Sequence, residues 1–153
     1  MSTEASAAAT PIVCDMTDAP DTAEERTAEW GRLLAAAYTG RQRIHGGVRL
    51  RLRADEGTEA WVRDLAARDK ACCPFLDFAV TTAPGEVRWE VTVAEGTVMD
   101  DDMARTIMEE FYNLPDTVGG GGAGMVGRLG EQGLAVSRNA SGTVMEVQRA
   151  TDA

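Results

Sequence analysis

The segment that most constrains the fold of this chain is an alternating run that follows two consecutive glycines. Val48, Leu50 and Leu52 recur at every second position, and arginines fill the positions between and after them. Successive side chains of a β-strand point to opposite faces, so the run predicts a strand over 47–53 with one buried and one solvated face. A sheet with one apolar face has to be covered by a second layer.

Helical periodicity elsewhere in the chain supplies that layer. A first helix is predicted over 22–38, because Thr22 is a good N-cap, acidic residues follow it and apolar residues then recur at helical spacing. A second is predicted over 58–72 with Thr58 as its cap, and a third over 99–113 with acidic residues in its first turn.

Three further strands are predicted from alternation and turn chemistry. A short strand covers 11–16, and a hairpin joins 76–82 to 86–93 through an Ala-Pro-Gly-Glu turn. If the hairpin lies beside the strand at 47–53, its outward glutamates can pair with the row of arginines. This pairing is favoured over an anion-binding role for the arginines, because the chain carries a formal net charge of −10.

These elements predict an α+β two-layer sandwich. Its β-α-β-α-β-β-α core spans residues 11–114 and has helices on one face of a mainly antiparallel or mixed sheet. Residues 1–10, rich in alanine, serine and threonine, are expected to form a flexible tail. Residues 115–153 are expected to form a glycine-rich linker, with Gly119–Gly122 too flexible for regular structure, and then a small α-β-β extension.

Charge and hydropathy narrow the classes of partner. The chain has 153 residues with 15 Lys+Arg against 25 Asp+Glu. The negative electrostatic field of such a chain repels nucleic acids and anionic membrane surfaces. No run of 18 apolar residues and no signal-peptide pattern is present, so a cytoplasmic location is expected. A homo-oligomer is compatible with the sequence.

The three cysteines are the strongest chemical signal. Cys72 and Cys73 end the second helix just before a proline, and Cys14 lies on the first strand. Adjacent cysteines rarely bridge each other, and three converging thiolates suit a soft ion of the mercury, arsenic or copper class. A structural zinc site would require a fourth ligand. Alternatively the cysteines only pack in the core. His45, the only histidine, is expected to be an exposed turn residue, with a role as fourth ligand as the alternative.

The segment WVRDLAARDKACCPFLDF, residues 61–78, resembles a small bacterial family with a Cys-Cys-Pro-Phe motif. Its members are free-standing proteins or are attached to MerR-type regulators. The resemblance extends over about residues 11–112, through PIVCDM, AEWGRLL and GGVRLRL. It implies thiolate chemistry, with mercury or arsenic as candidate ions, at Cys14, Cys72 and Cys73. Asp69 occupies a position where relatives often have glutamate.

Three functions are compatible with these residues. The first is a protein that binds a soft metal or metalloid ion through the three cysteines, with Arg68 and Lys70 as cations near the thiols. The second is an enzyme that acts on an organometal or another thiol-reactive substrate, as a carbon–metal lyase or a thiol reductase. In a lyase, Asp69 or Asp15 would serve as the acid, which requires a pKa raised by burial. The third is a cofactor-free domain that binds a partner.

Overall fold

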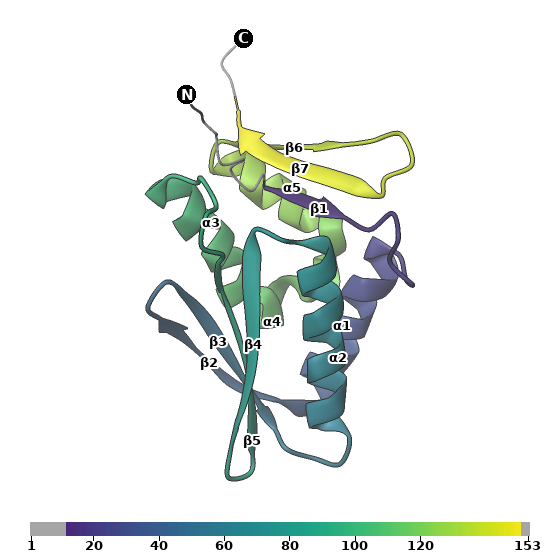
Figure 1. Ribbon diagram of the computed structural model, residues 1–153, viewed down its shortest axis with the longest axis vertical. Coiled ribbons are helices and arrows are strands. Elements are labelled where there is room, and N and C mark those ends of the chain that lie inside the picture. The colour runs from purple at the N-terminus through teal and green to yellow at the C-terminus, as the bar shows by residue number, and fades with distance from the viewer. Residues whose placement is uncertain (1–11, 151–153) are drawn as a thin grey trace, which may run out of the picture.

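The computed structural model describes residues 12–150, and the flexible tail predicted over 1–10 lies outside this range (Figure 1). The chain alternates helices with antiparallel strands and ends in a helix followed by a hairpin. In order, the elements are β1 (Val13–Asp15), α1 (Ala23–Ala37), β2 (Tyr38–Ile44), β3 (Gly47–Arg53), α2 (Thr58–Cys72), β4 (Leu76–Ala83), β5 (Glu86–Val93), α3 (Asp101–Tyr112), α4 (Leu114–Thr117), the 3-10 helix η1 (Val118–Gly120), α5 (Gly121–Glu131), β6 (Leu134–Arg138) and β7 (Val144–Arg149).

The larger sheet has the strand order β2-β3-β5-β4, with every neighbour antiparallel. Val48, Leu50 and Leu52 of β3 are fully buried on one face, beside residues of β5 on the same face. Helices α1, α2 and α3 pack against this sheet. The predicted α+β two-layer sandwich is therefore confirmed, and the sheet is antiparallel throughout.

The solvated face of the larger sheet carries the predicted ion pairs. Arg49 Nε lies 2.6 Å from a carboxylate oxygen of Glu90, and Arg51 Nε lies 2.9 Å from one of Glu86. Arg53 pairs instead with Asp55, whose carboxylate oxygen lies 3.2 Å from Arg53 Nε. The arginine row is thus explained by pairing on the sheet surface.

Strand β2 was not predicted from the sequence. Its residues, YTGRQRI, show no apolar alternation, because β2 is an edge strand with few buried side chains. Two arginines on its helix-covered face, opposite Leu50 and Val48 of β3, hold it to the end of α3 and to α4. Arg43 makes a bidentate ion pair with Glu109 at 2.9 Å, and Arg41 donates to Asp116 at 2.9 Å and to the Tyr112 carbonyl at 3.1 Å.

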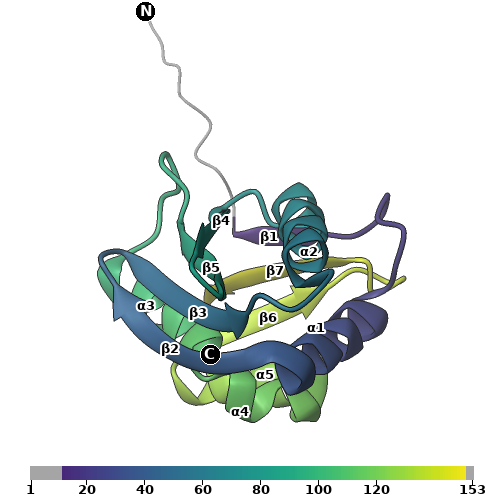
Figure 2. The ribbon, with the colours of Figure 1, turned by 90° about the horizontal axis from the view of Figure 1, so that it is seen from below.

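A second sheet, with the order β1-β7-β6, corrects the prediction of one sheet. Strand β1 pairs with β7, from the segment 115–153 that the sequence analysis treats as an extension. Figures 1 and 2 show this small sheet crossing one end of the helical layer. The first and last strands of the described chain therefore share one ladder, and this pairing fixes the position of β1.

The glycine run also differs from its prediction as a linker. Gly119 and Gly120 belong to η1, and Gly121 begins α5. Glycine costs about 1 kcal/mol per residue in a helix interior relative to alanine. Packing outweighs this cost, since α5 lies against α1 and β6 and buries Leu129. None of the helices described over 12–150 is long and apolar enough to cross a bilayer.

The two predicted threonine caps have different outcomes. Thr22 forms a full capping box at the start of α1, in which its hydroxyl accepts from Glu25 N and Glu25 accepts from Thr22 N. The prediction that Thr58 caps α2 is wrong. Gly57 is the N-cap, with φ 82°, and Thr58 is the first helical residue and is buried.

Candidate functional site: a thiol cluster between two cavities

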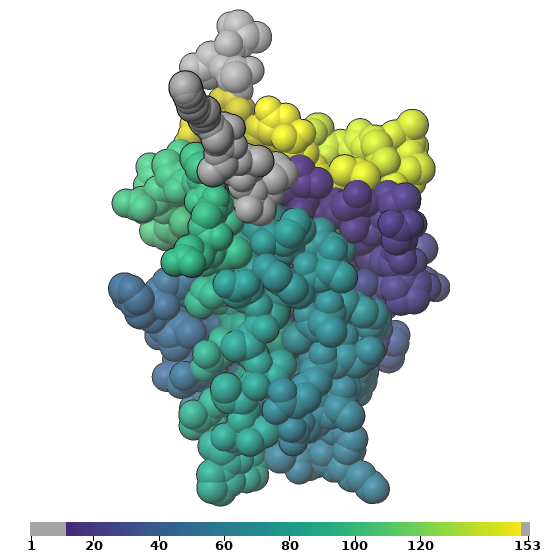
Figure 3. Space-filling model, viewed as in Figure 1, coloured from purple at the N-terminus to yellow at the C-terminus, as the bar shows by residue number. Residues whose placement is uncertain are grey.

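The three cysteines meet where the end of α2 reaches the small sheet. Cys72 is the last residue of α2, and Cys73 caps the helix by donating its main-chain N–H to the Asp69 carbonyl at 2.8 Å. Helix α2 contacts β1, where Cys14 pairs in register with Met145 of β7. In Figure 3, the atoms of β1 lie between those of the terminal hairpin and those of α2.

The two adjacent thiols face different cavities. Their sulfur atoms are 3.6 Å apart. Cys73 and Cys14 line one cavity of about 180 Å³ with mostly apolar walls. Cys72 lines a second, more polar cavity together with Arg26 and Arg68. Within residues 12–150, no three His, Cys, Asp or Glu side chains are already grouped so as to hold a metal ion.

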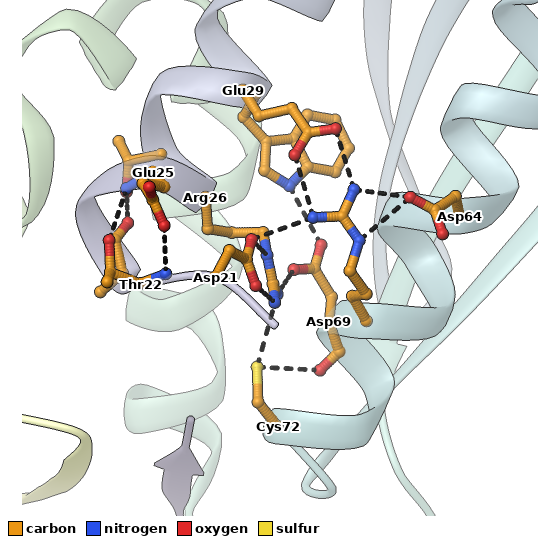
Figure 4. A network of polar contacts seen from close by, with 12 residues as sticks. Asp21, Thr22, Glu25, Arg26, Glu29, Asp64, Asp69 and Cys72 are labelled. Atoms are coloured by element: carbon orange, nitrogen blue, oxygen red, sulfur yellow. Dashed lines mark hydrogen bonds and ion pairs between the residues drawn. The ribbon is translucent and has the colours of Figure 1, made fainter. Parts of the chain in front are cut away.

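A buried arginine controls the surroundings of Cys72 (Figure 4). The Arg26 guanidinium donates two hydrogen bonds of 2.7 Å to Asp21 and one of 2.8 Å to Asp69. The nitrogen that bonds Asp69 also lies 3.7 Å from the Cys72 sulfur. The second oxygen of Asp69 accepts from Trp30 Nε1 at 3.0 Å. Helix α1 thus delivers a fixed positive charge to the end of α2.

Sequence reasoning missed Arg26, although a signal for it exists. Residues 26, 30, 33 and 37 follow the helical spacing of one face, and the structure buries all four of them. Arg26 is therefore a charged residue on an apolar stripe, and only 6% of its surface is exposed. A buried arginine needs anionic partners, so its position on the stripe predicts a charged cluster.

Hydrogen bonding and charge push the pKa values of the adjacent thiols apart. A hydrogen bond from Cys73, together with a hydrogen bond and the positive charge of Arg26, lowers the pKa of Cys72 from 9.0 to about 7. Burial and the negative charge of Asp69 oppose this shift. The neighbouring thiols of Cys14 and Cys72, together with burial, raise the pKa of Cys73 well above its ordinary value. Near neutral pH, Cys72 is therefore the residue of the adjacent pair that supplies a thiolate.

The two other cations expected near the thiols have different partners. Arg68 is held by Glu29, Asp21 and Asp64 at 2.7–2.9 Å. Lys70 donates to main-chain carbonyls of Pro74 and Leu76 and to Asp77. Arg26, from a different helix, fills the role for which Arg68 and Lys70 were proposed.

The two candidate acids occupy different environments. Burial raises the pKa of Asp69, while hydrogen bonds and charge from Arg26 oppose that rise, and its carboxylate holds both Arg26 and Trp30. Asp15 lies exposed beside the polar cavity, and hydrogen bonds from Thr17 lower its pKa. The raised pKa required of a general acid is thus found at Asp69 and is contradicted at Asp15.

His45 lies apart from the cysteines. It is exposed in the turn between β2 and β3, as the first interpretation of the sequence predicted. The cavity that it lines shares no residue with the two cavities at the thiols. His45 therefore lines neither of the cavities at the thiols.

Comparisons with protein-family models, with curated proteins and with solved structures find no match to this chain. The thiols, their partners and the cavities that they line are therefore the features that bear on its function.

Proposed function

We propose that this protein binds a soft metal or metalloid ion, of the mercury, arsenic or copper class, through the thiolates of Cys72 and Cys73, with Cys14 as the third ligand. The observation that carries the proposal is the 3.6 Å separation of the Cys72 and Cys73 sulfur atoms beside the Arg26 guanidinium. One soft ion can contact both sulfurs at this separation after small side-chain rotations. Thiolates are the ligands that such ions prefer.

The pKa values support the same role. Cys72, with a pKa of about 7, offers a thiolate for the first bond near neutral pH. Cys73 keeps its proton in the free protein, because its pKa is raised, and loses it when the ion binds. Binding of an ion should therefore release protons, and affinity should fall as the pH is lowered, more steeply below about 7, where Cys72 is protonated as well.

The position of Asp69 favours binding over cleavage of a carbon–metal bond. Both of its oxygens accept hydrogen bonds, from Arg26 and from Trp30, and the residue lines neither cavity at the thiols. In this arrangement Asp69 positions Arg26 against Cys72. A protein that takes up, holds or delivers the ion fits this geometry better than a lyase in which Asp69 donates a proton to the substrate.

Oxygen-free titration of the reduced protein with Hg(II), and separately with As(III), tests the proposal. The thiolate-to-metal absorption in the ultraviolet should saturate at one ion per chain. Cys73→Ser should lose most of the saturable signal, and Cys14→Ser should weaken binding at least tenfold, about 1.4 kcal/mol.

Ala67→Ser is the matched control, because it also introduces a serine on α2, at an exposed position that lines neither cavity at the thiols, and leaves every sulfur in place. It should titrate like the wild type. If the three cysteine-to-serine variants bind both ions as tightly as the wild type does, the proposal is wrong.

A further inference from the structure

The cavity on the Cys73 side of the thiol cluster is built for an apolar group. Its walls come chiefly from β1, α3, α4, α5 and β7 and from the segment just after α2. Aromatic, aliphatic and thioether side chains dominate them, chiefly those of Phe75, Ile107, Phe111, Leu114, Met125 and Leu129. The charged pair at the cavity is Glu110 and Arg128, which neutralise each other at 2.8 Å. Cys14 and Cys73 add their sulfur atoms to these walls.

The volume of this cavity sets the size of its occupant. It measures about 180 Å³. An apolar protein cavity of about 150 Å³ stays dry and binds benzene. A phenyl ring or a short alkyl chain therefore fits this space, whereas a bare ion held by the sulfurs would leave most of it unfilled.

We propose that the cavity binds the organic group of a monoorganyl mercury or arsenic compound whose soft atom is held by Cys73. This inference rests on the proposed function and names its substrate class. The apolar walls bind the carbon part, and the thiols at one side bind the metal or metalloid. The cavity next to Cys72 is lined by charged residues of both signs, Arg26, Arg68, Asp15 and Asp18, and does not suit the organic group.

Loading is an exchange of ligands without a change of oxidation state. A compound R–Hg–SR′, delivered by a small thiol, first bonds its mercury to the Cys72 thiolate, and the old Hg–S bond breaks. The leaving thiolate takes up the Cys73 proton as R′SH. The mercury then moves to the Cys73 sulfur, 3.6 Å from that of Cys72, and the Cys72 thiolate is restored. The carbon–mercury bond stays intact. Cys14 and Cys72 lie close enough to share the bound mercury afterwards.

Competition against a small thiol tests this inference. The reduced protein is equilibrated with phenylmercury, with methylmercury and with Hg(II), each in excess glutathione, and the bound fraction is measured by mass spectrometry of the intact chain. In each equilibrium an Hg–S bond to glutathione is exchanged for an Hg–S bond to the protein, so the strength of the Hg–S bond does not affect the comparison. Phenylmercury should be preferred over methylmercury at least tenfold, about 1.4 kcal/mol, because the ring fills the cavity.

Two variants of α5 separate the cavity from the rest of the helix. Met125→Trp fills the cavity and should remove the preference for phenylmercury, with Hg(II) binding kept. Val126→Trp is the matched control, because Val126 is the next residue and lines a different cavity. It should keep the preference. If circular dichroism shows that Met125→Trp does not fold, Leu114→Trp fills the same cavity from α4.

The outcomes distinguish this inference from the proposed function. Hg(II) binding without any preference between phenyl- and methylmercury in the wild type overturns the inference and leaves the proposed function standing. Equal loss of preference in Met125→Trp and Val126→Trp overturns it as well. Failure of the wild type to bind Hg(II) overturns both.

Discussion

At the scale of single residues, the chemistry of the site depends on contacts between two helices. Cys72 ends α2, at the negative end of the helix dipole, where a thiolate is disfavoured. The hydrogen bond from Cys73 is the main cause of the lowered pKa of Cys72, and Arg26 from α1 adds a hydrogen bond and a positive charge. Asp21 and Asp69 hold the guanidinium in place. The reactivity of Cys72 is therefore a property of the packed helices.

Alkylation measures the reactivity of Cys72 directly. Because its pKa is lowered to about 7, its rate of reaction with iodoacetamide should be half-maximal near pH 7. Cys73 should react only at much higher pH, because its pKa is raised. Fragmentation of the peptide that begins at Ala71 assigns the label to one cysteine or the other. A half-maximal rate for Cys72 near pH 9 would contradict this account.

Removal of the buried guanidinium should be costly. Arg26→Met leaves Asp69 as a buried carboxylate without its main partner, so the free energy of unfolding should fall by about 3–5 kcal/mol. The pKa of Cys72 should rise in the same variant. Urea denaturation and the alkylation profile measure the two effects.

Arg63→Met is the control for this change. Arg63 also lies on a helix and pairs with Glu59, but about half of its side chain is exposed. Its removal should cost less than about 1 kcal/mol. A similar cost for both variants would show that Arg26 is not the buried anchor described above.

The sequence identified some of these residues and missed others. Cys14, Cys72, Cys73 and Asp69 stand out by residue type and spacing, and the structure brings them together with contacts that the sequence could not specify. Arg26 was missed because an arginine in a helix usually lies on its solvated face. Only its position on the stripe with Trp30 indicates that it is buried.

At the scale of elements, the strands that bury one face were predictable and the edge strand was not. Strands β3 and β5 alternate apolar and polar residues because helices cover only one of their faces. Strand β2 gives no such signal, since main-chain pairing with β3 and arginine contacts with α3 hold it in place. Apolar alternation in a sequence reflects the burial of side chains, and β2 buries little of its side-chain surface.

A glycine at the start of β3 tests the packing of the larger sheet. A Cβ atom on Gly47 would lie 1.9 Å from the Val91 carbonyl oxygen, so β3 and β5 would have to separate. Gly47→Ala should therefore lower the free energy of unfolding by about 3 kcal/mol in urea denaturation.

Gly119→Ala provides the comparison for Gly47→Ala. A Cβ atom on Gly119 meets nothing within 4 Å, and its φ lies outside the left-handed region. Gly119→Ala should therefore change the free energy of unfolding by less than about 0.5 kcal/mol. A smaller effect at Gly47 than at Gly119 would mean that the β3–β5 contact is looser than described.

At the scale of the whole molecule, the pairing of β1 with β7 assembles the site. Cys14 and Cys73 come from separate parts of the chain, and β7 fixes β1 beside the end of α2. The sequence predicted the terminal hairpin and the strand over 11–16 but not that they pair, because register between distant strands depends on tertiary packing. An ion held by Cys14 and Cys73 would link the small sheet to the helical layer.

Such a link should raise thermal stability. A ligand present at 100 times its dissociation constant stabilises the folded state by about 2.7 kcal/mol. For a chain of this length each kcal/mol raises Tm by about 2–4 °C, so Hg(II) should raise Tm by about 5–10 °C. Differential scanning calorimetry should show a smaller rise for Cys14→Ser at the same Hg(II) concentration. Equal rises would mean that Cys14 takes no part in binding.

The proposed function requires the three cysteines to form one site for a soft ion. Anomalous X-ray diffraction from crystals of the reduced protein loaded with one equivalent of Hg(II) tests it most directly. One strong mercury peak should lie within bonding distance of the Cys73 sulfur and of at least one other cysteine sulfur. A mercury peak away from Cys73, or separate peaks on isolated thiols, would contradict it.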